Sequence, residues 1–342
     1  MRILLGMSGG VDSAFSALLL RQMGHDVEGC TLVMHEYSEC EEARGSANEL
    51  GIKHHILDAT ESFNNIIKKN FVDEYSNGRT PNPCILCNEK VKFRLLLDYA
   101  LSHGFDAIAT GHYASVVKIA DKQGERWAVG RASDLKKDQS YMLYRLPADI
   151  LQRLILPLSD TTKQDVRSSS SEVNLAVARK KDSQEICFLP DGNYAEYIES
   201  VKGVFPNGNF VDTDGKVIGE HRGIIRYTVG QRKGLGISLG ERAFVTKINP
   251  GNNEITLSTS NVGVTELILS EPVFSGIAYT KGIREARLLA KVRYTAPLVA
   301  CTVFFEREDL VRVEFDAPVK AAPGQSCVLY DGDVIALGGI IK

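Results

Sequence analysis

The chain has 342 residues, of which 44% are hydrophobic and 24% charged, and its formal net charge is −3. This composition is close to the globular average, so it excludes a disordered or fibrous chain, and the length predicts two or three domains. No hydrophobic run approaches the ~20 residues that a membrane span needs, and the run at 3–7 is too short for a signal peptide. We therefore expect a cytoplasmic protein without membrane contact. Its mild negative charge leaves RNA binding through local basic patches open.

The first 115 residues alternate strand and helix patterns. Strands are expected at 3–7, 27–33, 54–57 and 107–110, and helices at 13–23, 39–50, 62–75 and 89–103. Such alternation predicts parallel βαβ units and therefore an α/β fold with a doubly wound parallel sheet. A hairpin is expected over 114–131, followed by short helices between Ser140 and Ser170.

The character of the chain changes at about residue 205, where glycine becomes frequent and short alternating runs appear. These runs predict strands at 242–248, 254–257, 289–294, 298–305, 310–315, 326–330 and 334–337. We expect a catalytic domain over 1–195, a small mixed domain over 196–262 and a C-terminal antiparallel β-barrel over 263–342.

A glycine-rich turn, Ser8–Ser13 (SGGVDS), joins the first expected strand to the first expected helix. Glycines let the backbone approach an anion closely, and the N–H groups at a helix N-terminus point toward it. Asp12 places a carboxylate in this phosphate site, which predicts that it holds Mg²⁺. The simpler interpretation is an ordinary strand–helix turn, but the complete string in this context favours phosphate binding.

This string resembles SGGxDS, the signature of the PP-loop ATP pyrophosphatase superfamily, whose members have a HUP-like α/β domain. They cleave ATP between the α- and β-phosphates and activate a carbonyl oxygen as an adenylate. On spacing alone Met34 would be core filler. The resemblance instead implies that ATP and Mg²⁺ are cofactors and that the ATP site comprises Gly6, Met7, Ser8, Gly9, Gly10, Val11, Asp12, Ser13, Met34 and Gly111.

Seven further segments resemble, in order, the tRNA-specific 2-thiouridylase (MnmA/TrmU) family. They are TPNPCILCN at 80–88, ATGHYA at 109–114, KDQSY at 137–141, KDSQEICF at 181–188, GEHRG at 219–223, YTVGQRKG at 227–234 and VRY at 292–294. The family adenylates the C2 carbonyl of the wobble uridine in certain tRNAs and replaces its oxygen with sulfur, which gives 2-thiouridine, AMP and pyrophosphate. The resemblance implies tRNA contacts by Asn82, Pro83, Cys84, His112, Lys137, Asp138, Gln139, Arg293, Tyr294 and Gln325. Without the resemblance, His112 would be interpreted as a structural histidine, and residues 137–139 as a run of charged and polar residues exposed to solvent.

Two cysteines match the family's catalytic pair. By resemblance Cys187 accepts sulfur as a persulfide and Cys87 is the nucleophile, and both react as thiolates. Familiar members have aspartate where this chain has Cys84, which creates a Cys84-x-x-Cys87 pair in what Pro81 and Pro83 indicate is an extended loop. If Cys187 approaches this pair, Cys84, Cys87 and Cys187 supply three thiolates and leave one coordination position open, which suits a [4Fe–4S] cluster. There are two alternatives to the cluster. The three cysteines could bind zinc, or Cys84 could be a substitution without functional effect next to an ordinary persulfide mechanism.

Other functions remain open at this point. Another PP-loop ligase would need neither Cys87 nor Cys187, and a non-catalytic metal-binding RNA-binding protein would not need the intact Ser8–Ser13 loop. A thiol–disulfide oxidoreductase built on Cys84 and Cys87 should place the pair at the start of a helix. For the thiouridylase, the expected partners are a tRNA with a modifiable wobble uridine and a sulfur donor, which is a cysteine desulfurase, a sulfur carrier or inorganic sulfide.

Overall fold

The computed structural model describes residues 1–121, 124–172, 177, 186–189, 191–237, 242–260, 263–278 and 285–342. The expected hairpin turn at 122–123 and the 181–185 part of the KDSQEICF motif lie outside the described residues. Within the described ranges, every helix is too short or too polar to cross a bilayer.

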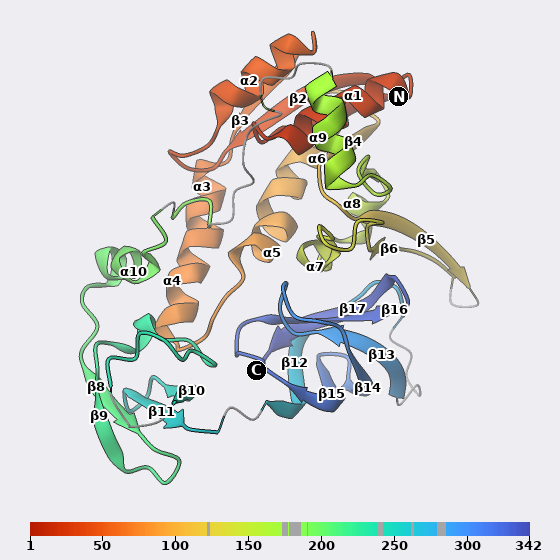
Figure 1. Cartoon of the computed structure of the whole chain (residues 1–342). Helices are drawn as coiled ribbons and strands as arrows, with labels where there is room; N and C mark the ends of the chain where they lie inside the picture. Colours follow the sequence, from red (N-terminus) through yellow and green to blue (C-terminus); the bar gives the residue numbers. More distant parts are fainter. Residues whose placement is uncertain are drawn as a thin grey trace.

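The N-terminal part is built on a five-stranded sheet in the order β3-β2-β1-β4-β7, with all neighbours parallel (Figure 1). Its strands are β1 (Arg2–Gly6), β2 (Asp26–Val33), β3 (His54–Asp58), β4 (Ala107–Thr110) and β7 (Leu154–Ile155). Successive residues of a strand point to opposite faces. Leu4 accordingly joins one hydrophobic cluster while Ile3 and Leu5 join another. Both faces of the sheet are covered, which confirms the doubly wound α/β class.

The helices of this part agree with the expected ones to within a few residues, except at the start of the helix expected over 89–103 and at Tyr194–Lys202, where no helix was expected. They are α1 (Val11–Gln22), α2 (Cys40–Glu49), α3 (Thr60–Ser62), η1 (Phe63–Lys68), α4 (Lys69–Ser76), α5 (Pro83–Cys87), η2 (Asn88–Lys92), α6 (Phe93–Ser102), α7 (Ser140–Leu143), α8 (Ala148–Leu151), α9 (Lys163–Glu172) and α10 (Tyr194–Lys202). Both η1 and η2 are π-helical turns inside longer helices. Such turns are frequent at functional sites, and η2 begins directly after Cys87.

The expected extended loop around the Cys84-x-x-Cys87 pair is wrong. The pair lies in α5, which continues through η2 into α6. Pro83 occupies the first turn of α5, where its missing N–H costs nothing, and Asn82 caps the helix by accepting from the Ile85 N–H (3.4 Å). The two cysteines are therefore i and i+3 on one helical face. The pair lies at the start of a helix, so the expected extended loop can no longer be used as an argument against a thiol–disulfide oxidoreductase.

The remaining strands form two further sheets. The middle sheet has the order β10-β11-β8-β9, from β8 (Gly208–Val211), β9 (Val217–His221), β10 (Phe244–Asn249) and β11 (Glu254–Ser258). The C-terminal sheet contains β12 (Val264–Phe274), β13 (Glu285–Lys291), β14 (Val299–Arg307), β15 (Leu310–Val319), β16 (Ser326–Asp331) and β17 (Val334–Ile341). Pairing of β12 with both β15 and β17 closes it into an antiparallel barrel, as expected. The sequence did not predict β8, β9 or β12.

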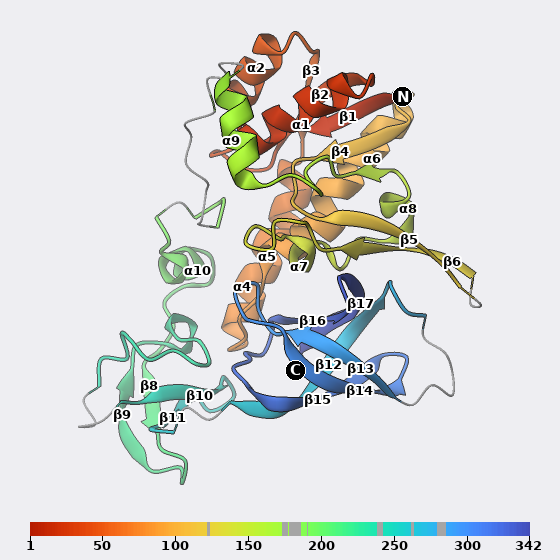
Figure 2. The same ribbon diagram turned by 45° about the vertical axis from the view of Figure 1, so that its right-hand side comes forward.

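The hairpin of β5 (Ser115–Asp121) and β6 (Gly124–Gly130) lies in the expected catalytic domain but extends the C-terminal sheet, because Gly130 pairs with Val334 of β17. A second link reaches the start of α5. The Gln325 side-chain amide donates to the Thr80 and Pro81 carbonyls (2.8 and 3.3 Å), and Thr80 N–H donates to the Pro323 carbonyl (2.8 Å). Figure 2 shows the barrel directly below α5 and α7. The C-terminal part thus fixes the segment that leads into the cysteine helix.

Candidate active site

The glycine-rich loop lies at the carboxyl end of β1 and opens α1, as predicted. Gly9 has φ +73°, a conformation that favours glycine, and a Cβ there would lie 3.0 Å from the Glu42 side chain. The Ser13 hydroxyl donates to the Gly10 carbonyl (2.9 Å) and accepts from the Ser8 N–H (3.3 Å). Gly10 makes no side-chain cap. The first N–H groups of α1 are therefore available for a phosphate.

Two expected ATP-site residues have buried side chains. Met7 and Val11 are each 3% exposed and belong to the core beneath the loop. A contribution of Met7 or Val11 to ATP binding can therefore come only from the backbone.

Asp12 stands in a cationic setting that the sequence did not reveal. Its carboxylate oxygens accept from Lys163 Nζ at 2.8 and 2.7 Å, and one of them also accepts from the Tyr113 hydroxyl at 2.7 Å. Lys163 is the first residue of α9 and its side chain is 9% exposed. An ammonium group thus occupies the place beside Asp12 where a cation would bind. The half-buried carboxylate fits the magnesium role expected for it.

Gly111 follows β4 at the carboxyl edge of the sheet and packs against the phosphate loop. A Cβ at this position would lie 2.8 Å from the Asp12 carbonyl carbon and 2.9 Å from the Ser13 nitrogen. Glycine is required here because any side chain would push the loop away. The ligand-binding edge predicted from topology and the loop are therefore in direct contact.

Met34, which the sequence assigned to the ATP site, lies against one of the thiols. It follows the carboxyl end of β2, and its sulfur lies 3.7 Å from the Cys87 sulfur. Its N–H donates to the Ser38 hydroxyl (3.0 Å), which holds the turn after β2 in place. If Met34 contacts adenine, as its resemblance to the family predicts, the base of ATP lies beside the nucleophile.

The three candidate thiols gather near this point. Cys87 is buried, whereas solvent reaches Cys84 and Cys187. Cys187 is positioned by its neighbour Phe188, whose ring packs on Phe63 and Phe71 at centroid distances of 5.5 and 5.4 Å. Among the described side chains, no three histidine, cysteine, aspartate or glutamate residues are grouped so that they could hold a metal ion.

The protein around these thiols, including Cys84 and Cys187 whose surfaces solvent still reaches, removes much of the water that would stabilise a thiolate. This burial raises the pKa of Cys87 to about 12, and it raises the pKa values of Cys84 and Cys187 in the same direction. Negative charge on Cys84 or Cys187 would raise the pKa of Cys87 further, so the thiols are close enough to interact. Without a ligand, the sulfurs are therefore thiols rather than thiolates at neutral pH.

Lys92, the last residue of η2, opposes this effect. Its positive charge lowers the pKa of all three thiols and is the main influence after burial on Cys84 and Cys87. No carboxylate in the described ranges forms an ion pair with Lys92. The ammonium therefore remains available to stabilise a thiolate or an anionic substrate next to Cys87.

His112 lies in the same surroundings. Thr110 Oγ1 is 2.9 Å from its Nδ1, and its ring lies 5.6 Å from that of Phe93. Burial, with a smaller contribution from Lys92, lowers the pKa of His112 to about 3. The imidazole is therefore neutral at physiological pH and can accept or donate a hydrogen bond without carrying charge.

We expect the His112 ring resonances to stay constant between pH 5 and 8, because the folded pKa is far below that range. In the unfolded chain the same ring should titrate near ~6.5. Since the folded pKa is the lower one, stability from the neutral ring is complete above about pH 6.5 and is lost as the pH falls toward 3. NMR of the native and urea-unfolded protein, assigned with His112→Gln, measures this. A native midpoint near 6.5 would contradict it.

The predicted tRNA contacts divide into two groups. Asp138 is 4% exposed and accepts from the Ala132 N–H and from the Ser140 N–H and hydroxyl. The Gln139 amide oxygen accepts from the Tyr113 N–H (2.9 Å) and Gln325 holds the 80–81 segment, so all three have internal partners. The surface is reached by Cys84, Arg293 and, in part, by Asn82, His112, Lys137 and Tyr294. Pro83 is buried. Contact of these residues with tRNA stays a prediction.

Sequence reasoning missed Lys163, and it assigned no role to Tyr113 or Lys92. Lys163 lies 151 positions from Asp12 in a polar stretch without any distinctive pattern. Tyr113 adjoins the predicted His112, and a buried tyrosine usually finds a partner for its hydroxyl, so that residue could have been proposed. No local signal identifies Lys163.

A glycine-rich loop that opens a helix at the carboxyl edge of a parallel sheet, with three thiols beside it, is the arrangement expected of a nucleotide-dependent α/β enzyme with thiol chemistry. The comparisons with known proteins agree. Residues 1–191 match the family "tRNA methyl transferase HUP domain", residues 196–259 the "tRNA methyl transferase PRC-barrel domain" and residues 247–341 the "Aminomethyltransferase beta-barrel domain". Our domain boundaries at 195 and 262 stay predictions.

Similar proteins match along the whole chain. The tRNA-specific 2-thiouridylase MnmA of Lachnoclostridium phytofermentans is 40% identical, over 99% of this chain and 99% of its own length. Those of Acetivibrio thermocellus and Desulforamulus reducens are 41% and 43% identical, over 100% of this chain and 99% and 97% of their own lengths. The chain belongs to the MnmA family of tRNA-specific 2-thiouridylases, which are ATP-dependent sulfurtransferases.

Proposed function

We propose that this protein converts the wobble uridine of its tRNA substrates to 2-thiouridine in two steps, adenylation by Mg·ATP and sulfur transfer through Cys87 and Cys187. The observation that carries the proposal is the 3.7 Å contact between the Met34 and Cys87 sulfurs. It joins the ATP side of the site to the thiol side, so an adenylated uridine would be formed within reach of the sulfur donor. The seven unpaired cysteines support a reducing, cytoplasmic setting.

In the first step the uridine O2 bonds to the α-phosphorus of ATP, the bond from that phosphorus to the bridging oxygen breaks, and pyrophosphate leaves with the electron pair. The N3 proton is released to solvent. Adenylation is needed because a urea-like oxygen is a very poor leaving group. Magnesium bound at Asp12 would neutralise charge on the phosphates, while Gly9 and the start of α1 supply backbone N–H groups.

In the second step the terminal sulfur of a Cys187 persulfide attacks C2 and AMP leaves. The Cys87 thiolate then attacks the Cys187 sulfur, which releases 2-thiouridine and leaves a Cys87–Cys187 disulfide. A thiol reductant must reduce that disulfide before the next turnover. The persulfide sulfur comes from a cysteine desulfurase or a sulfur carrier. Lys92 is placed to favour the thiolate because its charge opposes the rise in thiol pKa.

The proximity of the three thiols raises a second route for the sulfur, which must be tested against the first. Cys84 and Cys87 share a face of α5, and the charge of Cys84 raises the pKa of Cys187, so three thiols are near one another. They would be the ligands of a [4Fe–4S] cluster, and inorganic sulfide would then be the donor. In the present arrangement the thiols do not fit a cluster, because no three histidine, cysteine, aspartate or glutamate side chains in the described ranges are grouped closely enough to bind a metal ion. We therefore assign the transfer to the persulfide.

Anaerobic purification followed by quantification of iron, sulfide and zinc separates the two routes. For the persulfide route we expect less than one iron per chain, and thiolation of tRNA when a desulfurase and cysteine are supplied. Cys84→Asp, which restores the aspartate of familiar members, should then keep activity. Cys84→Ala tests whether any side-chain function is needed there.

The opposite result is equally clear. About four irons per chain, lost together with thiolation in both Cys84→Asp and Cys84→Ala while ATP still binds, would establish the cluster and overturn the persulfide assignment. Stoichiometric zinc without iron would overturn both routes.

A further inference from the structure

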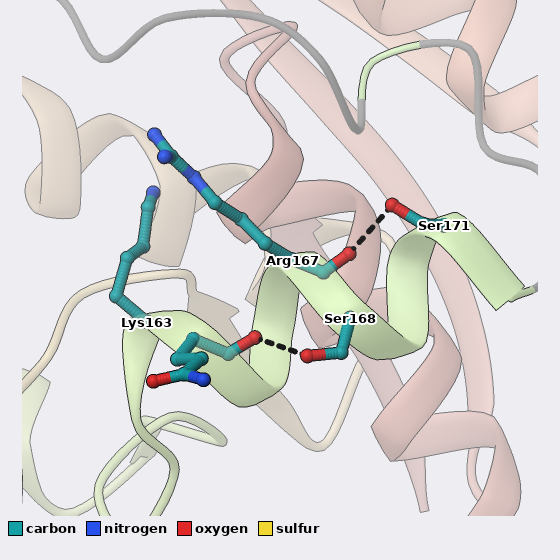
Figure 3. Close-up of a pocket in the computed structure, with 5 residues that line it drawn as sticks. Lys163, Arg167, Ser168 and Ser171 are labelled. Atoms are coloured by element: carbon teal, nitrogen blue, oxygen red, sulfur yellow. Dashed lines mark hydrogen bonds between the residues drawn. The ribbon is translucent and has the colours of Figure 1, made fainter.

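The open pocket along α9 belongs to the ATP side of the site, since Lys163 at its edge bonds Asp12. Its volume is about 440 Å³, and the residues that line it all come from this helix: Lys163, Gln164, Arg167, Ser168 and Ser171. The Ser168 and Ser171 hydroxyls donate to carbonyls one turn earlier (2.6 and 2.8 Å), as Figure 3 shows. The thiol side of the site is built differently, because its supporting contacts come from the C-terminal barrel.

Cys87 and Lys92 are joined by the π-helical turn η2. A π-helical turn links residues i and i+5, which is the spacing from Cys87 to Lys92. Against burial, which raises it, the pKa of Cys87 is lowered by the Lys92 ammonium and by a hydrogen bond from the Lys92 N–H. The other titratable groups that act on Cys87 are Cys84 and Cys187, and both raise its pKa. The geometry of η2 therefore decides how strongly the Cys87 thiolate is supported.

The first two residues of η2 are held by α7 and the residues after it. The Asn88 amide donates to the Met142 carbonyl (3.0 Å). The Glu89 carboxylate accepts from Arg145 Nε (2.5 Å), and both of these side chains are only 11% exposed. Lys90 also pairs with Glu89 (2.7 Å), but it belongs to the same turn, so this pair cannot fix the turn to another element. Arg145 is the cation that holds Glu89 from outside η2.

The barrel holds Arg145 through Glu271 of β12. The Glu271 carboxylate accepts from Arg145 Nη2 (3.2 Å). Glu271 has φ +48°, which residues other than glycine rarely adopt, and it lies where the register of β12 shifts between Ser270 and Val273. A bulge of this kind redirects a side chain, and here the side chain reaches the catalytic domain.

Two tyrosines fix the backbone next to Arg145 to the same barrel. The Tyr141 hydroxyl donates to the Ser326 carbonyl (2.8 Å), and the Tyr144 and Ser326 hydroxyls bond each other (3.1 Å). These bonds place the backbone, whereas Glu271 places the guanidinium. Because the Glu271 side chain is 65% exposed, removing its charge should change the stability of the fold little.

We propose that Glu271 and Arg145 are positioning residues for sulfur transfer, because they hold Glu89, and with it the turn η2, so that Lys92 stays beside Cys87. This inference rests on the transfer through Cys87 and Cys187 proposed above. Without Glu271 the guanidinium keeps one carboxylate instead of two and turns toward solvent, which releases Glu89 and lets η2 relax. Lys92 then moves away from Cys87.

The step that depends on this link is the attack of the Cys87 thiolate on the Cys187 sulfur. In it the Cys87–Cys187 bond forms, the bond from the Cys187 sulfur to the sulfur on uridine C2 breaks, and the electron pair leaves with 2-thiouridine. Adenylation takes place at the phosphate loop and does not use η2. Loss of the link should therefore slow the second step and spare the first.

The first test follows one turnover of tRNA and Mg·ATP on protein loaded with persulfide by a cysteine desulfurase. In Glu271→Gln the adduct between Cys187 and tRNA should resolve about tenfold more slowly than in the wild type, while pyrophosphate release stays within about twofold. Non-reducing gels measure the adduct, and thermal melting verifies the fold. Glu266→Gln is the matched control, because Glu266 lies in the same strand, is 55% exposed and pairs with Arg312 of the barrel itself (3.4 Å).

A second variant tests whether Glu271 acts through Arg145. Arg145→Lys keeps a cation for Glu89, but one ammonium cannot hold two carboxylates as the guanidinium fork does, so the adduct should again resolve slowly. The Glu271→Gln/Arg145→Lys double variant should be no slower than the slower single variant. Effects that multiply would show that the two residues act independently and would overturn the link.

Hydrogen exchange measures the turn itself without any reaction. The backbone amides of residues 88–93 should exchange about tenfold faster in Glu271→Gln than in the wild type, and Glu266→Gln should match the wild type. Slow adduct resolution with unchanged exchange, or faster exchange with normal resolution, would each overturn the positioning role. So would equal effects of the two glutamate substitutions.

The proposal and the proposed function can fail separately. If Glu271→Gln equals the wild type in exchange and in adduct resolution, the positioning role is wrong even though thiolation through Cys87 stands. If Cys87→Ser gives no adduct and the protein contains a cluster, the proposed sulfur step is wrong. The exchange of residues 88–93 in Glu271→Gln against Glu266→Gln then still decides whether the barrel holds η2.

Discussion

Asp12→Asn should stop pyrophosphate release and 2-thiouridine formation, with a loss of at least about 10³-fold, while the protein stays folded. An amide is a poor ligand for magnesium, so the phosphates would lose a contact on which adenylation depends. The asparagine oxygen can still accept from Lys163 and the Tyr113 hydroxyl, so the native packing around the loop should survive.

Pyrophosphate release with tRNA and Mg·ATP measures this effect, and circular dichroism with thermal melting verifies the fold. Asp98→Asn is the control, because this exposed carboxylate on α6 lies outside the site and its ion pair within the described ranges is a long one, with Arg94 at 3.9 Å. Turnover of Asp12→Asn within about tenfold of wild type would exclude a metal role for this carboxylate.

Cys87→Ser and Cys187→Ser should each abolish 2-thiouridine formation yet leave tRNA-dependent pyrophosphate release measurable, because adenylation does not use sulfur. The two variants should stop at different points. Without Cys187 no sulfur is carried, so no covalent intermediate forms. Without Cys87 the sulfur bonded to uridine C2 stays linked to Cys187 as a disulfide. A serine hydroxyl cannot cleave that disulfide.

A protein–tRNA adduct on non-reducing gels, released by a small thiol, is therefore expected for Cys87→Ser alone. Cys40→Ser is the matched control, since Cys40 begins α2 and its pKa is shifted by burial and by charges of α2 and not by the other thiols. An adduct in Cys187→Ser, or normal thiolation by either variant, would contradict the assigned roles. Loss of iron in both variants would instead favour the cluster route.

Local patterns were sufficient for much of the fold. The spacing of hydrophobic residues in the first 115 positions predicted β1 to β4 and the major helices. It could do so because side-chain periodicity and glycine caps depend on only a few neighbouring residues. The local patterns gave the wrong structure at Pro83, since a proline is typical both of an extended segment and of the first turn of a helix. Here the Asn82 side chain caps the helix and stabilises it. The strands β8, β9 and β12 were missed, because short or irregular strands depend on their pairing partners.

The chemistry of the site followed from sequence where the residues are contiguous. The phosphate loop and the cysteine pair were readable as strings, and family membership follows from motifs spread along the chain. What the sequence did not contain was the set of neighbours of each group. Lys163 beside Asp12, Met34 against Cys87 and Lys92 near Cys187 are pairs that only the packing of segments far apart in the sequence creates.

The same limit applies to the expected tRNA contacts. The sequence placed Asp138 and Gln139 in a polar stretch, where exposure is the common outcome, and it offered Gln325 as a polar contact in the last domain. Tertiary structure instead gave each an internal hydrogen bond, and Gln325 holds the segment in front of the cysteine helix from a barrel 245 positions away. Sequence by itself determined the family and the fold class, since those depend on residue identity and local order. The pKa values of the thiols and of His112, and the cation held by Asp12, were decided only by burial and long-range contacts, because desolvation and ion pairing depend on what surrounds a group in space.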